Sequence, residues 1–170
     1  TTLMQEAAEG IRKRGKKILV FAPTTNGADV LKKEGFYSAN TVSQFLQNPT
    51  LQERTKNQVV WIDEAGLLGV KAMKNLFEVA EKNNFKLVLS GDVKQFSPIV
   101  RCEALKILED NACLEVKRIT QIHRQKKQAY KEAVFAISQG NIIDGFDKLD
   151  KLNSIIEFED RKELVDILVE

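Results

Sequence analysis

Four side chains suited to metal and nucleotide chemistry follow two short apolar runs of this sequence. Asp63 and Glu64 directly follow the run VVWI, and Asp92 and Gln95 come shortly after the run LVLS. A short apolar run that ends abruptly in polar residues is typical of a strand buried on both faces of a parallel sheet. Because the carboxyl ends of parallel strands meet at one edge, we expect these side chains to lie together there. Such an edge can hold Mg²⁺ and a polarised water against a nucleoside triphosphate.

Each of these residue types suits one step of nucleotide hydrolysis. Asp63 suits Mg²⁺, a hard cation that keeps several waters and takes one or two carboxylates. Glu64 suits a general base for the attacking water, a role worth roughly 10²–10⁴ in rate. Gln95 can hydrogen-bond to a γ-phosphate or orient the water. An Asp-Glu pair alone more often marks a solvated turn or a helix N-cap, but the Gly-Asp-x-x-Gln signal about thirty residues later favours the catalytic interpretation.

The composition is that of an ordinary globular protein. The chain has 170 residues, of which 43% are hydrophobic and 29% charged, and its formal net charge of +2 neither indicates nor excludes a nucleic-acid partner. Cys102 and Cys113 lack a metal-type spacing and are interpreted as free thiols in a reducing compartment. No apolar run approaches the roughly 18 residues of a membrane span, and no signal peptide is visible. We therefore expect a cytoplasmic protein without a membrane segment.

The order of predicted elements indicates an α/β protein with a parallel sheet. Predicted strands cover 17–22, 59–63, 86–90 and 114–119. Predicted helices cover 2–14, 26–33, 41–46, 70–83 and 103–109, and residues 49–56 are predicted to form a polar loop. Thr41 is the expected N-cap of its helix. Trp61 lies inside a predicted strand and is expected to pack in the core.

The sequence texture changes near Lys126. Helices are predicted over 128–138 and 142–149, then a short strand over 154–158 and a helix from Asp160. This part is interpreted as the opening of a second domain. The predicted domains are therefore 1–125 and 126–170.

Five short segments form a set of motifs: APTTNGA (22–28), TVSQFL (41–46), WIDEAG (61–66), GDVKQ (91–95) and IHRQ (122–125). Together they resemble the motifs of the RecD-type branch of superfamily 1 helicases. They are most similar to the helicase region of a conjugative relaxase, the class of protein that nicks, pilots and unwinds plasmid DNA. The resemblance implies a RecA-like P-loop NTPase sheet flanked by helices, with 1–125 as part of the first helicase domain. It also implies an ATP-dependent DNA helicase or translocase that uses ATP and Mg²⁺, acts on single-stranded DNA and has proteins of the conjugation machinery as partners.

The same resemblance assigns nucleotide roles to individual residues. It implies that Thr1 and Asp63 bind Mg²⁺ and that Glu64 activates the attacking water. Gln95 is implied to contact the γ-phosphate and to couple nucleotide state to DNA. Arg124 is implied to be an arginine finger, a role worth about 10³–10⁵ in rate.

The resemblance also implies a path for single-stranded DNA. Pro23, Thr24, Thr25 and Thr41 would line that path. Their backbone amides and hydroxyls would hold phosphates without reading the base sequence.

One expected motif does not occur in the chain. The phosphate loop G-x-x-x-x-G-K-[ST] is not found, although Thr1–Ala8 is similar to the residues that directly follow Gly-Lys in this family. The resemblance therefore implies a truncated sheet, without its first strand and the phosphate loop. We expect the isolated chain not to hydrolyse ATP.

Two other functions remain open from the sequence. One is a non-catalytic DNA-binding or secretion-recognition module that has kept a vestigial helicase fold. The other is a RecD-like subunit of a repair helicase. The complete set of Asp63, Glu64, Gln95 and Arg124 favours an active motor over the non-catalytic module.

Overall fold

The computed structural model describes residues 2–92, 104–112, 114–119 and 126–158. Its chain divides into two compact units, Thr1–Val116 and Lys117–Glu170. The domains predicted from the sequence, 1–125 and 126–170, refer to family domains rather than to these units and stay a prediction.

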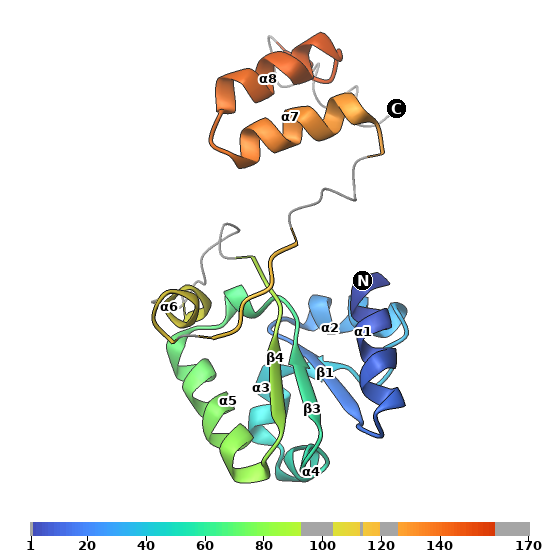
Figure 1. Cartoon of the computed structure of the whole chain (residues 1–170), viewed down its shortest axis with the longest axis vertical. Coiled ribbons are helices and arrows are strands. Elements are labelled where there is room, and N and C mark those ends of the chain that lie inside the picture. The colour runs from blue at the N-terminus through green and yellow to red at the C-terminus, as the bar shows by residue number, and fades with distance from the viewer. Residues whose placement is uncertain (1, 93–103, 113, 120–125, 159–170) are drawn as a thin grey trace. The chain divides into compact units, whose positions relative to one another are not determined.

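The first unit is built around a four-stranded parallel sheet (Figure 1). Its strands, in the spatial order β2-β1-β3-β4, are Asn40–Thr41, Ile18–Ala22, Val59–Ile62 and Lys86–Leu89. In the register, Phe21 pairs with Ile62 and Ile62 pairs with Leu89. The three longer strands therefore end level with one another, and the residues that follow them emerge at a single edge.

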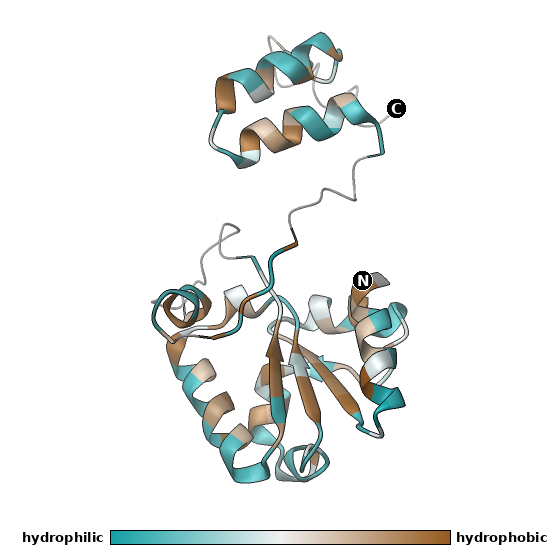
Figure 2. Ribbon diagram, in the orientation of Figure 1, coloured by the Kyte–Doolittle hydropathy of each residue, from teal (hydrophilic) through white to brown (hydrophobic). Residues whose placement is uncertain are grey.

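Helices cover both faces of this sheet, which confirms the predicted α/β class. They are α1 (Thr2–Lys13), α2 (Thr25–Lys33), α3 (Val42–Gln47), α4 (Pro49–Glu53), the 3₁₀ helix η1 (Ala65–Leu67), α5 (Val70–Asn83) and α6 (Ala104–Asn111). Alternate residues of a strand point to opposite faces, so β1 contributes to two cores. Val20 packs with residues of α1 and α2, whereas Phe21 packs with residues of α3 and α5. Figure 2 shows the apolar strands between these helices.

Phe21 belongs to the core formed with residues of α3 and α5. It is 1% exposed, and its ring stacks on Phe45 of α3 with the centroids 4.5 Å apart. Burial of such a side chain contributes about 1.5–3 kcal/mol to folding. This packing anchors α3, and with it the N-terminus of α3, against the sheet.

The second unit contains a helical hairpin of α7 (Gln128–Ser138) and α8 (Ile142–Lys151). Gly140 turns the chain with φ +84°, a conformation that glycine adopts without steric cost. Gly145 of α8 lies against α7, since a Cβ atom there would come 3.1 Å from the carbonyl oxygen of Ala133. The absence of a side chain at Gly145 therefore allows the two helices to pack closely.

Several elements differ from the sequence prediction. Residues 114–119, predicted as a strand, have exposed side chains and pair with no described strand, and a strand is stable only beside a partner. Residues 154–158 are not a strand either, because the Ser154 amide instead caps α8 by donating to Leu149 O at 3.0 Å. The predicted loop 49–56 contains α4, which Asn48 caps by accepting from Leu51 N at 3.1 Å. The short strand β2 was not predicted, and the predicted helix from Asp160 lies outside the described residues.

Among the described residues, no helix is both long enough and apolar enough to cross a membrane.

Candidate functional site

Asp63 occupies the edge at which the three longer strands end. Its amide donates to Phe21 O at 2.9 Å, which ties it to the end of β1. On the other side, the Ser90 amide donates to Ile62 O at 2.9 Å, and Ser90 O accepts from Ala65 N at 2.8 Å. Asp63 is half-buried and lies between two neighbouring strand ends. The parallel register therefore fixes the backbone of Asp63 without any contribution from the Asp63 side chain.

The carboxylate of Asp63 has a defined partner on the next strand. Its Oδ1 accepts from Ser90 Oγ at 2.8 Å. Ser90 Oγ in turn accepts from the indole Nε1 of Trp61 at 2.7 Å. These three half-buried residues form a hydrogen-bonded chain across β3 and the end of β4.

Glu64 has a left-handed backbone, with φ +52° and ψ +34°. This conformation is uncommon for a residue other than glycine, and it costs on the order of 1–3 kcal/mol. Its side chain is exposed and lies beside the first turn of α2, because a Cβ atom on Gly27 would come 3.4 Å from Glu64 Oε2. A carboxylate is favourably placed there by the positive end of the helix dipole. Asp63 and Glu64, adjacent in sequence, are thus directed to different neighbours.

The turns that follow β3 and β4 are in backbone contact. A Cβ atom on Gly91 would lie 2.9 Å from Gly66 N and 3.2 Å from Ala65 N. A Cβ atom on Gly66 would lie 3.2 Å from Asp92 O. The structure therefore brings Asp63, Glu64 and the backbone of Asp92 to one edge, whereas Gln95, the fourth residue of the predicted group, lies outside the described residues.

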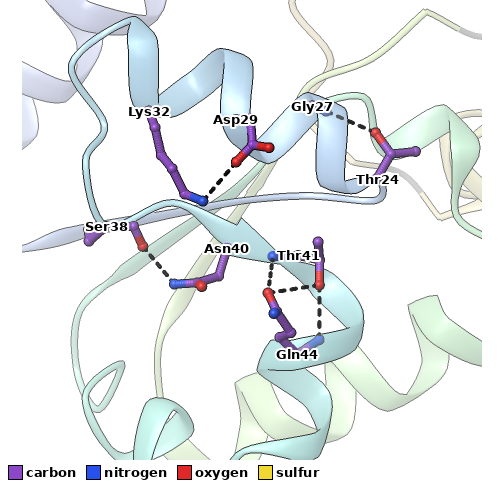
Figure 3. Close-up of polar contacts among 8 residues, drawn as sticks. All are labelled: Thr24, Gly27, Asp29, Lys32, Ser38, Asn40, Thr41 and Gln44. Atoms are coloured by element: carbon purple, nitrogen blue, oxygen red, sulfur yellow. Dashed lines mark hydrogen bonds and ion pairs between the residues drawn. The ribbon is translucent and has the colours of Figure 1, made fainter.

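Two helix N-caps stand beside each other at the same edge (Figure 3). Thr24 caps α2, and its Oγ1 accepts from Gly27 N at 3.0 Å. Thr41 caps α3, its Oγ1 accepts from Gln44 N at 3.1 Å, and Gln44 Oε1 accepts from Thr41 N at 3.1 Å in a capping box. Because Ala22 pairs with Thr41 in the sheet, the two caps are neighbours.

Of the residues assigned to the DNA path, Thr24 and Thr25 are exposed, whereas Pro23 and Thr41 are half-buried. Farther along α2, the ammonium of Lys32 bonds to Asp29 Oδ1 at 2.9 Å and lowers the pKa of that exposed carboxyl. The exposed hydroxyls of Thr24 and Thr25 can serve as donors to a phosphate.

Three of the predicted site residues, Thr1, Gln95 and Arg124, lie outside the described residues. Their roles therefore stay predictions.

Ser90 is a residue of this site that the sequence did not single out. The available signal was a polar residue directly after an apolar run, at the strand position that follows the Ile62–Leu89 pair. Trp61 was expected only to pack in the core. It does contact the core that contains Val20, and its indole also donates to Ser90.

The donor set fits Mg²⁺ better than a metal that needs a complete protein cage. In the part of the chain that the structure describes, no group of three or more His, Cys, Asp or Glu side chains is arranged to hold a metal ion. Mg²⁺ needs only one or two carboxylates, because it keeps several waters and uses phosphate oxygens. Asp63, whose Oδ1 accepts a hydrogen bond from Ser90, supplies one such carboxylate.

Comparison with known proteins gives two findings. A model of the AAA domain family matches residues 1–160. Three curated proteins match over 144 residues: a probable conjugal transfer protein TraA of Sinorhizobium fredii (strain NBRC 101917 / NGR234) at 28% identity, a conjugal transfer protein TraA of Rhizobium radiobacter at 27%, and one of Agrobacterium fabrum (strain C58 / ATCC 33970) at 26%. Each match covers 84% of this chain and 13% of the relative. Both findings confirm the resemblance recognised in the motifs.

Proposed function

This chain belongs to the AAA domain family, and on that premise we propose that it is part of the ATP-hydrolysing core of a DNA helicase or translocase in a conjugative relaxase. Membership of the family implies nucleotide binding, and the finer function rests on the site. The observation that carries the proposal is the placement of Asp63 and Glu64 at the carboxyl edge of the sheet, beside two helix N-caps.

The nucleotide half of the proposal assigns one task to each acidic side chain. Asp63 would hold a hydrated Mg²⁺ through Oδ2, because Ser90 engages Oδ1. Glu64 would take a proton from the attacking water at one of its carboxylate oxygens. Bound Mg²⁺ would supply neutralisation of the phosphate charge. Thr1, Gln95 and Arg124 keep their proposed roles as metal ligand, γ-phosphate contact and arginine finger.

The DNA half of the proposal uses the two N-caps. The Thr24 hydroxyl accepts from Gly27 N, so its hydrogen remains for a phosphate oxygen. The Thr41 hydroxyl also donates to Gln44 Oε1 at 3.2 Å, a bond that it would exchange for one to a charged phosphate oxygen. Thr24, Thr25 and Thr41, with Pro23 between strand and helix, would hold successive phosphates of a single strand. Glu64 lies beside Gly27 in the first turn of α2, so DNA at the Thr24 cap would be close to the proposed base.

We also propose that β4 pairs with a further parallel strand that is not among the described strands. β4 is the end strand of the described sheet, yet its run LVL is apolar and only half-buried. An apolar edge strand is unfavourable unless it is covered. A strand that ends in the phosphate loop would cover it, and it would complete the RecA-like sheet that the resemblance implies.

The curated relatives are named as conjugal transfer proteins, which favours conjugation over a RecD-like role in repair. The chain spans only 13% of their length, so the activity of a whole protein of that kind is part of the proposal.

The test is the ATPase rate, with and without single-stranded DNA, of this chain and of the longest natural protein that contains it. We expect DNA-stimulated hydrolysis by the longer protein, none by this chain, and loss of hydrolysis in Glu64→Gln. Glu78→Gln, which removes an exposed carboxylate on α5, is the matched control. If the longer protein is inactive but binds DNA, the non-catalytic module replaces the motor.

A further inference from the structure

A chain of hydrogen bonds leads from the core of the first unit to the proposed metal ligand. Trp61 Nε1 lies 2.7 Å from Ser90 Oγ, and Ser90 Oγ lies 2.8 Å from Asp63 Oδ1. The indole N–H can only donate, and an ionised carboxylate can only accept. The Ser90 hydroxyl is therefore the one group that can join the two.

The hydrogen bonds that join Trp61, Ser90 and Asp63 can run in only one donor-to-acceptor order. Ser90 Oγ accepts from Trp61, so its only hydrogen goes either to Asp63 Oδ1 or to Ile62 O, which is 3.3 Å away. The carboxylate is both nearer and charged, and hydrogen bonds to charged acceptors are roughly twice as strong as neutral ones. The donor order is therefore Trp61 to Ser90 to Asp63.

Rigid parts of the fold hold each member of this chain. Trp61 lies inside β3, paired with Val20 on one side and Val88 on the other. The Ser90 backbone is bonded at both ends, through its amide to Ile62 O and through its carbonyl to Ala65 N. The carboxylate of Asp63 therefore receives its hydrogen bond from a fixed donor.

We propose that Ser90 is a positioning residue, which engages Oδ1 of Asp63 so that Oδ2 is presented to the hydrated Mg²⁺, and that Trp61 orients the Ser90 hydroxyl. Only the identity of the ligand rests on the proposed function, since the hydrogen bonds do not depend on it. Ser90 acts through Asp63 and needs no contact with the nucleotide. Mutation of a residue that hydrogen-bonds to a metal ligand typically lowers metal affinity or activity by 10- to 100-fold.

Trp61 also makes this chain of hydrogen bonds observable, because it is the only tryptophan of the sequence. Its indole N–H gives a single NMR cross-peak in the 170-residue chain. We expect Asp63→Asn to move that cross-peak, and to move it much less when Ser90→Ala is also present. Ser90→Thr keeps the hydroxyl and is expected to restore the response.

Ser138→Ala, which removes a hydroxyl bonded to Phe135 O in α7, is the control and should leave the response intact. An equal response to Asp63→Asn with and without the Ser90 hydroxyl overturns the hydrogen-bonded chain. If Ser90→Ala does not fold, the comparison of Ser90→Thr with Ser90→Cys, a far weaker donor, decides the same question.

The positioning role is tested through the Mg²⁺ dependence of ATP hydrolysis in the longer protein. We expect Ser90→Ala to raise the half-saturating Mg²⁺ concentration roughly 10- to 100-fold, with kcat nearly recovered at saturating Mg²⁺. Ser90→Thr should restore the Mg²⁺ requirement, and Trp61→Phe should raise it by a smaller factor.

A lower kcat with an unchanged Mg²⁺ requirement overturns the positioning role, even if the NMR result stands. A longer protein that hydrolyses no ATP rejects the proposed function, and with it the presentation of Asp63 to Mg²⁺. The hydrogen-bonded chain is then judged by the NMR cross-peak alone.

Discussion

Glu64 shows how a single residue can be placed for chemistry at the expense of stability. Its left-handed backbone at φ +52° turns the chain sharply after β3 and brings the carboxylate beside α2. A residue other than glycine loses roughly 1–2 kcal/mol in this conformation. Such strain is often retained at functional sites, where the side chain matters more than the backbone cost.

We therefore predict that Glu64→Gly leaves stability unchanged or raises it by up to about 1 kcal/mol. Relief of the left-handed strain outweighs the greater flexibility of glycine in the unfolded chain, which costs roughly 0.5–1 kcal/mol. Urea unfolding, followed through the fluorescence of Trp61, measures the change. Glu78→Gly, in the middle of α5, is the control and should cost about 1 kcal/mol. Equal losses in both variants would show that Glu64 is not strained.

Gly91 is constrained by a close approach rather than by its backbone angles. A Cβ atom there would meet two backbone nitrogens of the turn after β3, at 2.9 Å and 3.2 Å. Backbone cannot move aside as a flexible side chain can, so we expect Gly91→Ala to cost roughly 1–3 kcal/mol. Gly10→Ala is the control, because nothing lies within 4 Å of that position in α1. It should gain roughly 0.5–1 kcal/mol, since alanine favours a helix. Thermal unfolding compares the two, and similar shifts would contradict the close approach.

At the scale of elements, the N-termini of α2 and α3 combine two tasks. Thr24 and Thr41 stabilise their helices, and the same hydroxyls are proposed to bind DNA. Removal of a cap costs about 1 kcal/mol wherever it occurs. A hydrogen bond to a charged group contributes about 1.5–3 kcal/mol. The two tasks can therefore be separated by comparison with a cap that has no part in the DNA path.

We predict that Thr24→Ala and Thr41→Ala each weaken single-stranded DNA binding by roughly tenfold. Asn48→Ala removes the cap of α4, where Asn48 Oδ1 accepts from Leu51 N, and should lower stability by a similar amount without changing DNA affinity. Fluorescence anisotropy with a labelled oligothymidine at one fixed salt concentration measures the affinities. An equal loss in all three variants would indicate an effect on folding instead.

The sequence predicted those elements whose signals are local. The apolar runs of β1, β3 and β4 and the amphipathic period of α5 were recognised, and Thr41 was correctly expected to cap α3. Residues 114–119 have a strand-like composition, but composition cannot show whether a partner strand is present. The dipeptide β2 is too short to leave a pattern, and its pairing with Phe21 and Ala22 depends on the tertiary fold.

The part of the site that has a local sequence signal was predictable. Asp63 and Glu64 follow a recognisable run, and the parallel arrangement is enough to place them at an edge. The role of Ser90 depends on strand register, since 27 residues separate it from Asp63 along the chain. A hydrogen bond across that distance has no local sequence signature.

At the scale of the whole molecule, the described sheet ends in β4, an apolar strand with no described strand on its outer side. Lys86 and Ser90 donate their amides to the β3 side, at 2.9 Å to Gln58 O and 2.9 Å to Ile62 O. Because successive amides of a strand alternate in direction, those of Leu87 and Leu89 point away from β3. A further parallel strand beside β4 would accept these bonds.

We predict that the amide hydrogens of Leu87 and Leu89 exchange rapidly in the 170-residue chain and slowly in a longer protein that contains it. Both amides should gain protection together, because the added strand supplies an acceptor for each. Hydrogen exchange read by mass spectrometry or NMR measures the difference. Val59 in β3, whose amide already donates to Lys17 O of the neighbouring chain segment at 3.0 Å, is the internal control and should change little. Equally rapid exchange of Leu87 and Leu89 in the longer protein would reject the added strand and the RecA-like sheet it would complete.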